Sequence, residues 1–76
     1  MFLSPRRPKQ IEFARQLIKV GCLKRKEIMY AIIDVYKVPM IKAKDRYQKA
    51  LEDLLKHGYT VAVNSVNFVR AWKDNI

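Results

Sequence analysis

Two glycines and one internal proline divide this chain into four segments, and this division constrains the fold more than any other feature. Gly21, Pro39 and Gly58 each stand where an apolar pattern ends. In the three segments before Gly58, apolar residues recur at intervals of three and four, which is typical of amphipathic helices. In the last segment they alternate with a period of two, as in strands. The sequence therefore predicts three helices followed by a β-hairpin.

The first helix is predicted from about Lys9 to Val20, and Gly21 after it is expected to adopt the left-handed conformation of a helix cap. The second helix is predicted from about Lys24 to Tyr36. It is apolar on most of its sides, so we expect it to be the central and most buried helix. No strand is evident between these two helices.

Pro39 ends the second helix, because the residue before a proline avoids the helical region. Proline is also accepted in a first helical turn, so the third helix is predicted from Pro39 or Met40 to about His57, with Gly58 as its cap. His57 is expected to satisfy carbonyl groups in the last turn. The predicted core face comprises Met40, Ala43, Tyr47, Ala50, Leu51 and Leu54.

The hairpin is predicted from the segments YTVAV and VNFVRAW, which are separated by Asn64 and Ser65. A two-residue turn at these positions would pair the apolar residues with one another on one face. A four-residue loop is the alternative. The two-residue turn pairs Val63 with Val66, Val61 with Phe68 and Tyr59 with Arg70. Phe68 and Trp72 are then expected in the core or at its edge.

Length and composition limit the function classes. A chain of 76 residues with half of them apolar is expected to form one domain, residues 9–76, after a basic arm of residues 1–8. This fold class is mainly α with a C-terminal β-hairpin, and it leaves no room for a deep catalytic cleft.

The net charge of +9 and the pI of about 10 indicate an anionic partner: nucleic acid first, then an anionic membrane surface or an acidic protein. The N-terminus does not have the pattern of a signal peptide. The longest apolar run, Ile28 to Ile33, is too short to span a bilayer. A single cysteine, Cys22, fits a reducing compartment. We therefore expect a cytoplasmic protein that is not associated with a membrane.

The order of predicted elements resembles a winged helix-turn-helix domain. The residues that carry the resemblance are Glu27-Ile28 early in the second helix, Val38 at the turn, and Leu51-x-x-Leu54-x-x-x-Gly58-Tyr59-x-Val61. The resemblance covers about residues 9–72. It implies that the third helix is the recognition helix, that its front enters the major groove of DNA, and that the segment after Gly58 forms the wing.

Ten residues are predicted to contact DNA. On the front of the third helix these are Lys42, Arg46 and Lys49; at the start of the second helix, Lys24, Arg25 and Lys26; in the arm, Arg6 and Arg7; and at the wing tip, Asn64 and Ser65. Arginine is the best candidate to read a guanine. The cations of the second helix would hold a phosphate at its backbone amides. The alternatives are a solvated helix face, a solubilising cluster and simple turn residues.

Catalysis has little support in the sequence. His57 has no evident partner, and Cys22 lacks the spacing of a metal or redox motif, so it is interpreted as a small buried residue. There is no glycine-rich phosphate loop. We expect no enzymatic activity, no cofactor and no metal site.

Two functions remain. The first is a small double-stranded DNA-binding protein, either a transcription regulator or an accessory factor in recombination or replication. The alternative is a protein-binding adaptor or inhibitor of the phage or plasmid type, which docks on a larger machine such as RNA polymerase. No dimerisation element is evident after Trp72, so a monomer or a weak dimer is expected.

Overall fold

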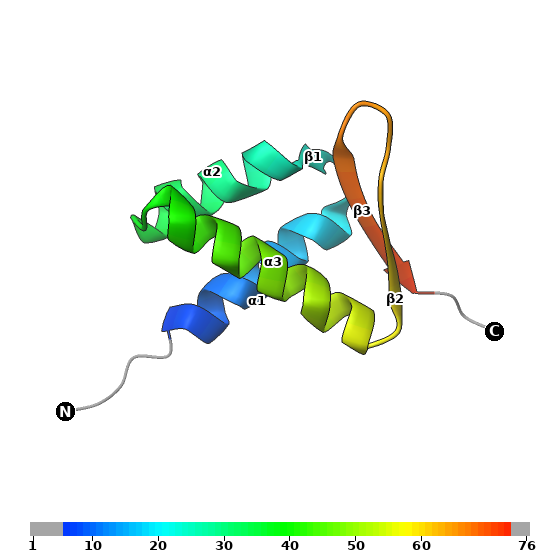
Figure 1. The fold of residues 1–76 in the computed structure, drawn as a ribbon, viewed down its shortest axis with the longest axis horizontal. Helices are drawn as coiled ribbons and strands as arrows, with labels where there is room; N and C mark the ends of the chain where they lie inside the picture. Colours follow the sequence, from blue (N-terminus) through cyan, green and yellow to red (C-terminus); the bar gives the residue numbers. More distant parts are fainter. Residues whose placement is uncertain (1–5, 74–76) are drawn as a thin grey trace.

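A computed structural model describes residues 6–73 of the chain (Figure 1). It confirms a mainly α fold that ends in a β-hairpin, with two of the three helices within one residue of their predicted bounds. The elements are α1 (Arg6–Val20), β1 (Leu23–Lys24), α2 (Arg25–Tyr36), α3 (Met40–Lys56), β2 (Tyr59–Val63) and β3 (Phe68–Lys73).

Helix α1 begins at Arg6, three residues before the predicted start. Pro8 therefore lies in its first turn, where the missing N–H of proline would have no intrahelical partner in any case. Residues 6–8 of the predicted arm are helical, and residues 1–5 lie outside the described part of the chain.

The three helices form a core together with the inner face of the sheet. Its largest fully buried side chains are Ile18 of α1, Ile28 and Ile32 of α2, Leu54 of α3 and Val69 of β3. Helix α2 buries Ile28, Met29 and Ile32, whereas its apolar residue Val35 is more than half exposed. Leu51, which the third-helix pattern assigned to the core face, is half-buried.

A short strand lies between α1 and α2, where none was predicted. β1 pairs Leu23 with Val69 and Lys24 with Phe68, so the antiparallel sheet has the order β1-β3-β2 with β3 in the centre. Two residues are too few to show the alternation of apolar and polar residues that marks a strand in a sequence. This strand is therefore recognised only by its pairing with β3.

The hairpin has the longer of the two loops considered. Val63 pairs with Val69, Val61 with Ala71 and Tyr59 with Lys73, so the predicted pairing is wrong by three residues. Residues 64–67 form a four-residue loop. Oδ1 of Asn64 accepts hydrogen bonds from the backbone N–H groups of Val66 and Phe68 at 3.0 and 2.9 Å, and Asn67 takes a left-handed φ of 69°.

A shift by an odd number of residues exchanges the two faces of a strand. Val69 and Ala71 therefore face the helices, while Phe68, Arg70 and Trp72 lie on the outer face of the sheet. Trp72 is 40% exposed, so its predicted place in the core is wrong.

Helix ends follow the glycine pattern with one exception. Gly21 and Gly58 have φ values of 78° and 87°, which confirms both predicted caps. Helix α2, however, ends on Lys37 with φ 55° and ψ 44°, and the N–H of Lys37 donates to the carbonyl of Ile33 at 2.8 Å. A non-glycine residue here carries a steric cost.

Among residues 6–73, no helix combines the length and the apolar character that crossing a membrane requires.

Candidate nucleic-acid interface

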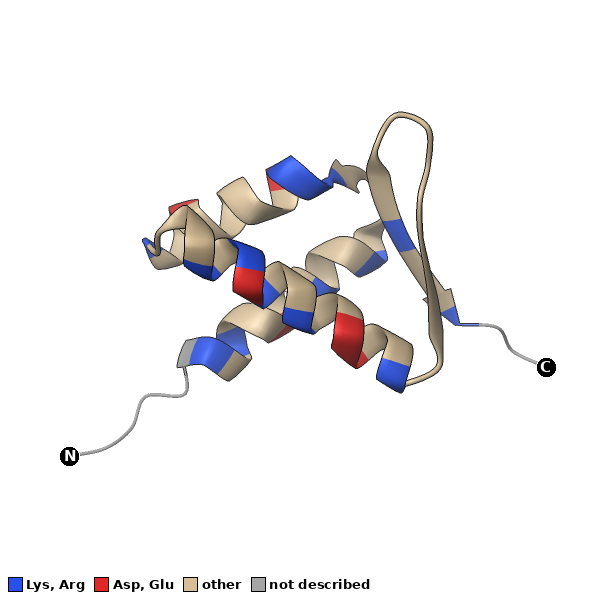
Figure 2. Ribbon diagram, in the orientation of Figure 1, with Lys and Arg blue, Asp and Glu red and all other residues tan. Residues whose placement is uncertain are grey.

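Positive charge is spread over several elements (Figure 2). Lysine and arginine occur on all three helices and on β3, whereas the segment 59–73, which forms the hairpin, contains no aspartate or glutamate. The ten predicted DNA contacts fall into two groups on different sides of the fold.

The first group lies at the start of α2. Because β1 leads directly into α2, Lys24, Arg25 and Lys26 surround the first helical turn, and all three are exposed. The side chain of Glu27 accepts a hydrogen bond from the backbone N–H of Lys24 at 2.8 Å, which fixes the entry of the chain into the helix. Within residues 6–73, no ion pair engages any of the three cations.

This cluster faces the wing across a cavity of about 500 Å³, which is lined by Lys24, Arg25, Lys26, Val63 and Asn67. Of the two predicted wing contacts, Asn64 uses its carbonyl oxygen inside the loop, and Ser65 is exposed at the turn. Asn67 was not among the predicted site residues. Its left-handed backbone, which follows from the four-residue loop, places it beside the helix start.

The local electrostatics at this point favour an anion. The first N–H groups of a helix have no intrahelical acceptor, and the helix dipole makes its N-terminus partly positive. Three cations at such a position repel both one another and the dipole. An anionic ligand, such as a phosphate, would relieve this repulsion and would accept hydrogen bonds from the free N–H groups.

Arg25 also connects this cluster to α3. Its guanidinium carbon lies 5.9 Å from the centre of the Tyr47 ring, a cation–π contact. Burial raises the pKa of Tyr47, and the nearby charge of Arg25 opposes that rise. Tyr47 therefore stays neutral at physiological pH, and its ring holds the guanidinium of Arg25 against the third helix.

Helix α3 presents different residues to its two sides. Lys42, Arg46 and Lys49 share one face, while Lys44 and Gln48 share another, roughly 150° away at 100° per residue. Lys44 and Gln48 lie about 60° and 100° around the helix from Tyr47, on the side away from Arg46. Because Tyr47 contacts Arg25, this is the side of α3 nearer the α2 cluster. The predicted front residues lie toward α1 instead.

Arg46 is held inside this α1-facing side. Its side chain is only 11% exposed. Nε donates to Oε1 of Gln10 at 2.7 Å, and Nη1 donates to Oδ2 of Asp45 at 2.6 Å. The residue selected from the sequence as a base reader thus has its guanidinium bonded within the protein.

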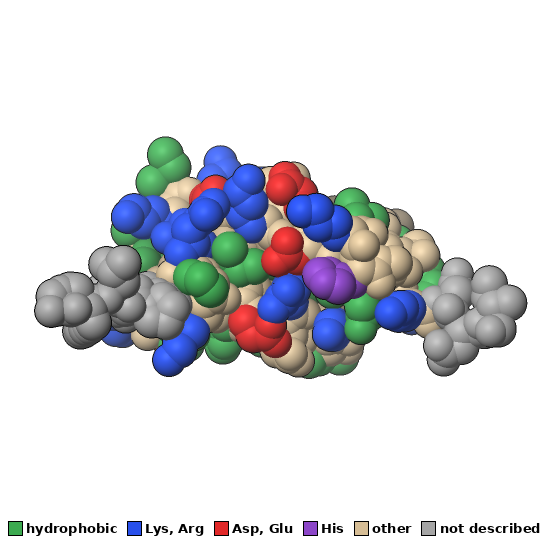
Figure 3. Space-filling view, turned by 90° about the horizontal axis from the view of Figure 1, so that it is seen from below, with side chains coloured by type: hydrophobic (Ala, Val, Ile, Leu, Met, Phe, Trp, Pro, Cys, Tyr) green, Lys and Arg blue, Asp and Glu red, His purple; other side chains and the backbone are tan. Residues whose placement is uncertain are grey.

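The rest of the second group surrounds Arg46. Nε of Arg7 donates to Oδ2 of Asp45 at 3.3 Å. Nζ of Lys49 lies 3.6 Å from Oε1 of Glu52. Lys42 is exposed. For Arg6, only the backbone is described. Figure 3 shows basic side chains gathered toward the end of the molecule where the N-terminus lies, with acidic side chains and the histidine nearer the middle.

Two residues considered for chemistry are both exposed. Cys22 is at the surface, so the prediction that it is buried is wrong; its Sγ lies 3.7 Å from the carbonyl of Val20. His57 donates from Nδ1 to the carbonyl of Asp53 at 2.7 Å, as expected for a histidine in a last helical turn. In residues 6–73, no cluster of three histidine, cysteine or acidic residues could hold a metal ion.

Comparisons of this chain with protein-family models, with curated proteins and with solved structures found no match.

Proposed function

We propose that this protein binds double-stranded DNA in the manner of a winged-helix domain, with the start of α2 and the wing clamping one phosphate backbone. The element order α1-β1-α2-α3-β2-β3, with β1 paired to the wing strand β3, supports the resemblance seen in the sequence. The single observation that carries the proposal is the cavity lined by Lys24, Arg25, Lys26 and Asn67.

The three cations at the start of α2 have no ion-pair partner in the described part of the chain. Exposed cations at a helix N-terminus have an electrostatic cost unless an anion neutralises them. DNA presents phosphates continuously, and cationic contacts to them provide most of the affinity for random sequence. The wing, on the opposite wall of the cavity, would approach the same backbone with Asn67.

The contribution of α3 differs from the one expected from the sequence. The residues of α3 nearest the α2 cluster are Lys44 and Gln48, so we assign base or phosphate contacts to them. Lys42 and Lys49 remain available for phosphates on the flank of the helix. Arg46 is assigned to the junction of α3 with α1, because its guanidinium already makes two hydrogen bonds there.

A salt titration of binding to random duplex DNA tests the proposal. With about five or six phosphates contacted, the plot of log affinity against log salt should have a slope of about −5. Lys26→Ala should weaken binding and reduce the slope by about one unit. The matched control is Lys56→Ala, which removes the same charge from an exposed position in the last turn of α3.

Absence of duplex binding at low salt would refute the proposal. An equal loss in the Lys26 and Lys56 variants would also refute it, since the affinity would then reflect net charge rather than the α2 cluster.

One observation favours the adaptor as a second candidate. Ile41 and Leu55 are 75% and 58% exposed, and together with Gln48 they form a stripe with seven-residue spacing along the outer side of α3. Two exposed apolar residues on one side of a helix, here with Gln48 between them, suit a partner helix. A protein that binds no duplex DNA and forms an Ile41-dependent complex with a purified candidate machine such as RNA polymerase would support the adaptor.

A further inference from the structure

The outer face of the sheet carries a row of three planar side chains, of which Arg70 and Trp72 are exposed and Phe68 is half-buried. Phe68, Arg70 and Trp72 alternate along the central strand β3 with the inward-facing Val69 and Ala71. Alternate residues of a strand are roughly 6.7 Å apart, so the row extends for about 13 Å. Figure 1 shows the helices packed to one side of the hairpin. The alternation along β3 places the row on the face opposite the buried Val69.

Each aromatic ring in the row has a cation over it, and this cation would move from the ring to a phosphate when a base stacks there. Nζ of Lys24, which pairs with Phe68 across β1 and β3, lies 5.7 Å from the centre of the Phe68 ring. The guanidinium carbon of Arg70 lies 5.7 Å from the centre of the Trp72 ring. The neighbouring outward positions on β2 hold the small residues Thr60 and Ala62, which pair with Trp72 and Arg70 and leave the row accessible.

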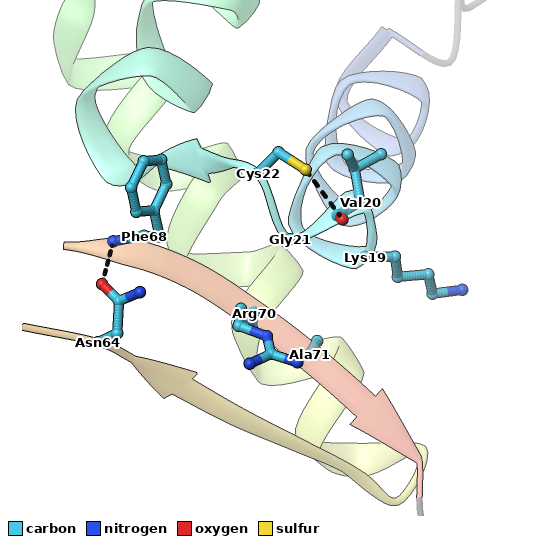
Figure 4. Close-up of a pocket in the computed structure, with 8 residues that line it drawn as sticks. All are labelled: Lys19, Val20, Gly21, Cys22, Asn64, Phe68, Arg70 and Ala71. Carbon is cyan, nitrogen blue, oxygen red and sulfur yellow. Dashed lines mark hydrogen bonds between the residues drawn. The ribbon is translucent and has the colours of Figure 1, made fainter. Parts of the chain in front are cut away.

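The row adjoins a cavity of about 550 Å³ between β3 and the end of α1 (Figure 4). Phe68, Arg70 and Asn64 line it from the hairpin, and Gly21 and Cys22 line it from the α1–β1 connection. The side chain of Arg70 passes close to Gly21, where an added Cβ would lie 3.6 Å from its Cγ. Figure 4 shows the side chain of Lys19 extending away from the other residues of the cavity.

We propose that this outer face binds single-stranded nucleic acid, with bases stacked on Phe68 and Trp72 and phosphates paired with Arg70 and Lys24. Exposed aromatic rings on a basic surface are the recurring means by which proteins hold single strands, because every base has a flat face to stack. The proposal does not rest on duplex binding, since Phe68, Arg70 and Trp72 do not line the α2 cavity; Lys24 borders both sites.

The pattern of the row favours a single strand over duplex DNA and over a protein partner. In a duplex the base faces are already stacked, so Phe68 and Trp72 would gain nothing from it. The centre of a protein interface is usually depleted of charge. Here a cation stands next to each ring, which matches a ligand in which flat apolar groups and anions alternate.

Trp72 is the only tryptophan in the chain, so its fluorescence reports on this face alone. Titration with an oligothymidylate of about ten nucleotides, within the usual range of site sizes, should quench it. Trp72→Ala should weaken binding of a labelled strand by about five- to hundredfold, as loss of one stacked base does. Trp72→Phe should recover most of that loss.

Arg70→Ala should weaken single-strand binding and reduce its log–log salt slope by about 0.7 unit, the value for one phosphate of a single strand. Lys56→Ala is again the charge-matched control and should leave the slope unchanged. Because Trp72 and Arg70 are exposed, circular dichroism should show that all variants remain folded.

Three results would overturn the proposal: no quenching by the oligonucleotide, no loss of affinity in Trp72→Ala, or equal quenching by polyglutamate of the same charge. The last would identify a general anionic or protein ligand. The duplex proposal fails separately. If Trp72→Ala weakens single-strand binding but Lys26→Ala leaves duplex binding unchanged, the single-strand proposal stands and the duplex proposal fails.

Discussion

Nε of Arg46 donates a hydrogen bond to Oε1 of Gln10 over 2.7 Å, and this bond joins the third helix to the first. Gln10 is 3% exposed and is the one buried polar side chain among the described residues. A second link lies further along the same helices, where Nη1 of Arg15 is 3.3 Å from Oδ2 of Asp53. The α1–α3 junction therefore uses Arg46, which the sequence alone presents as part of a DNA-binding face, together with the pair Arg15 and Asp53.

Arg46→Ala should destabilise the fold more than it weakens DNA binding. The substitution leaves the buried amide of Gln10 without its partner, which costs about 1–3 kcal/mol. Urea unfolding should show this loss, whereas Lys42→Ala, at an exposed position on the same face, should change stability by less than about 0.5 kcal/mol. If Arg46→Ala is as stable as the wild type but binds DNA much more weakly, the prediction is wrong and Arg46 contacts DNA.

Stability should depend on the ionisation of Asp45. Hydrogen bonds from Arg46 and Arg7 lower the pKa of this carboxyl, and desolvation only partly opposes them. A lowered pKa in the folded state means that the stabilisation is complete above the unfolded pKa of about 3.9 and disappears as the pH falls through the folded value. Thermal melts between pH 7 and pH 2 should therefore show a smaller acid loss in Asp45→Asn than in the wild type. Identical pH profiles would contradict this.

Lys37→Gly should stabilise the protein. Lys37 has φ 55°, a conformation that costs a residue with a Cβ roughly 1 kcal/mol and costs glycine nothing. The gain is reduced by the larger entropy of glycine in the unfolded chain. The control is Lys37→Ala, which keeps the strain and removes only an exposed ion pair with Asp34 at 3.9 Å. The urea midpoint of Lys37→Gly should be higher than those of the wild type and of Lys37→Ala.

Two leucines of α3 should differ in their sensitivity to truncation. Leu54 is 2% exposed, so Leu54→Ala should cost about 2–5 kcal/mol, a large share of the total stability of a small domain. Leu51 is half-buried, and Leu51→Ala should cost clearly less. Equal urea midpoints for the two variants would show that the face of α3 is rotated from the one described.

The helices and their ends were accessible from the sequence because they depend on local interactions. Gly21, Gly58 and Pro39 act on the backbone within one turn. The spacing of Ile28 and Ile32 in α2, and of Ala50 and Leu54 in α3, follows the helical period. Strand β1 was missed, because a two-residue strand exists only through its pairing with Val69 and Phe68.

The hairpin register and the candidate site were decided by tertiary structure. Alternating apolar residues fit more than one pairing of Val61 and Val63, and the hydrogen bonds of Asn64 together with the packing of Val69 select one of them. That selection places Arg70 and Trp72 on the outer face. Likewise, helical spacing shows that Arg46 and Lys49 share a side of α3, but only the position of Gln10 on α1 shows which neighbour that side meets. A charge in a sequence indicates attraction to an anion; whether it is free to bind one depends on partners distant in the chain.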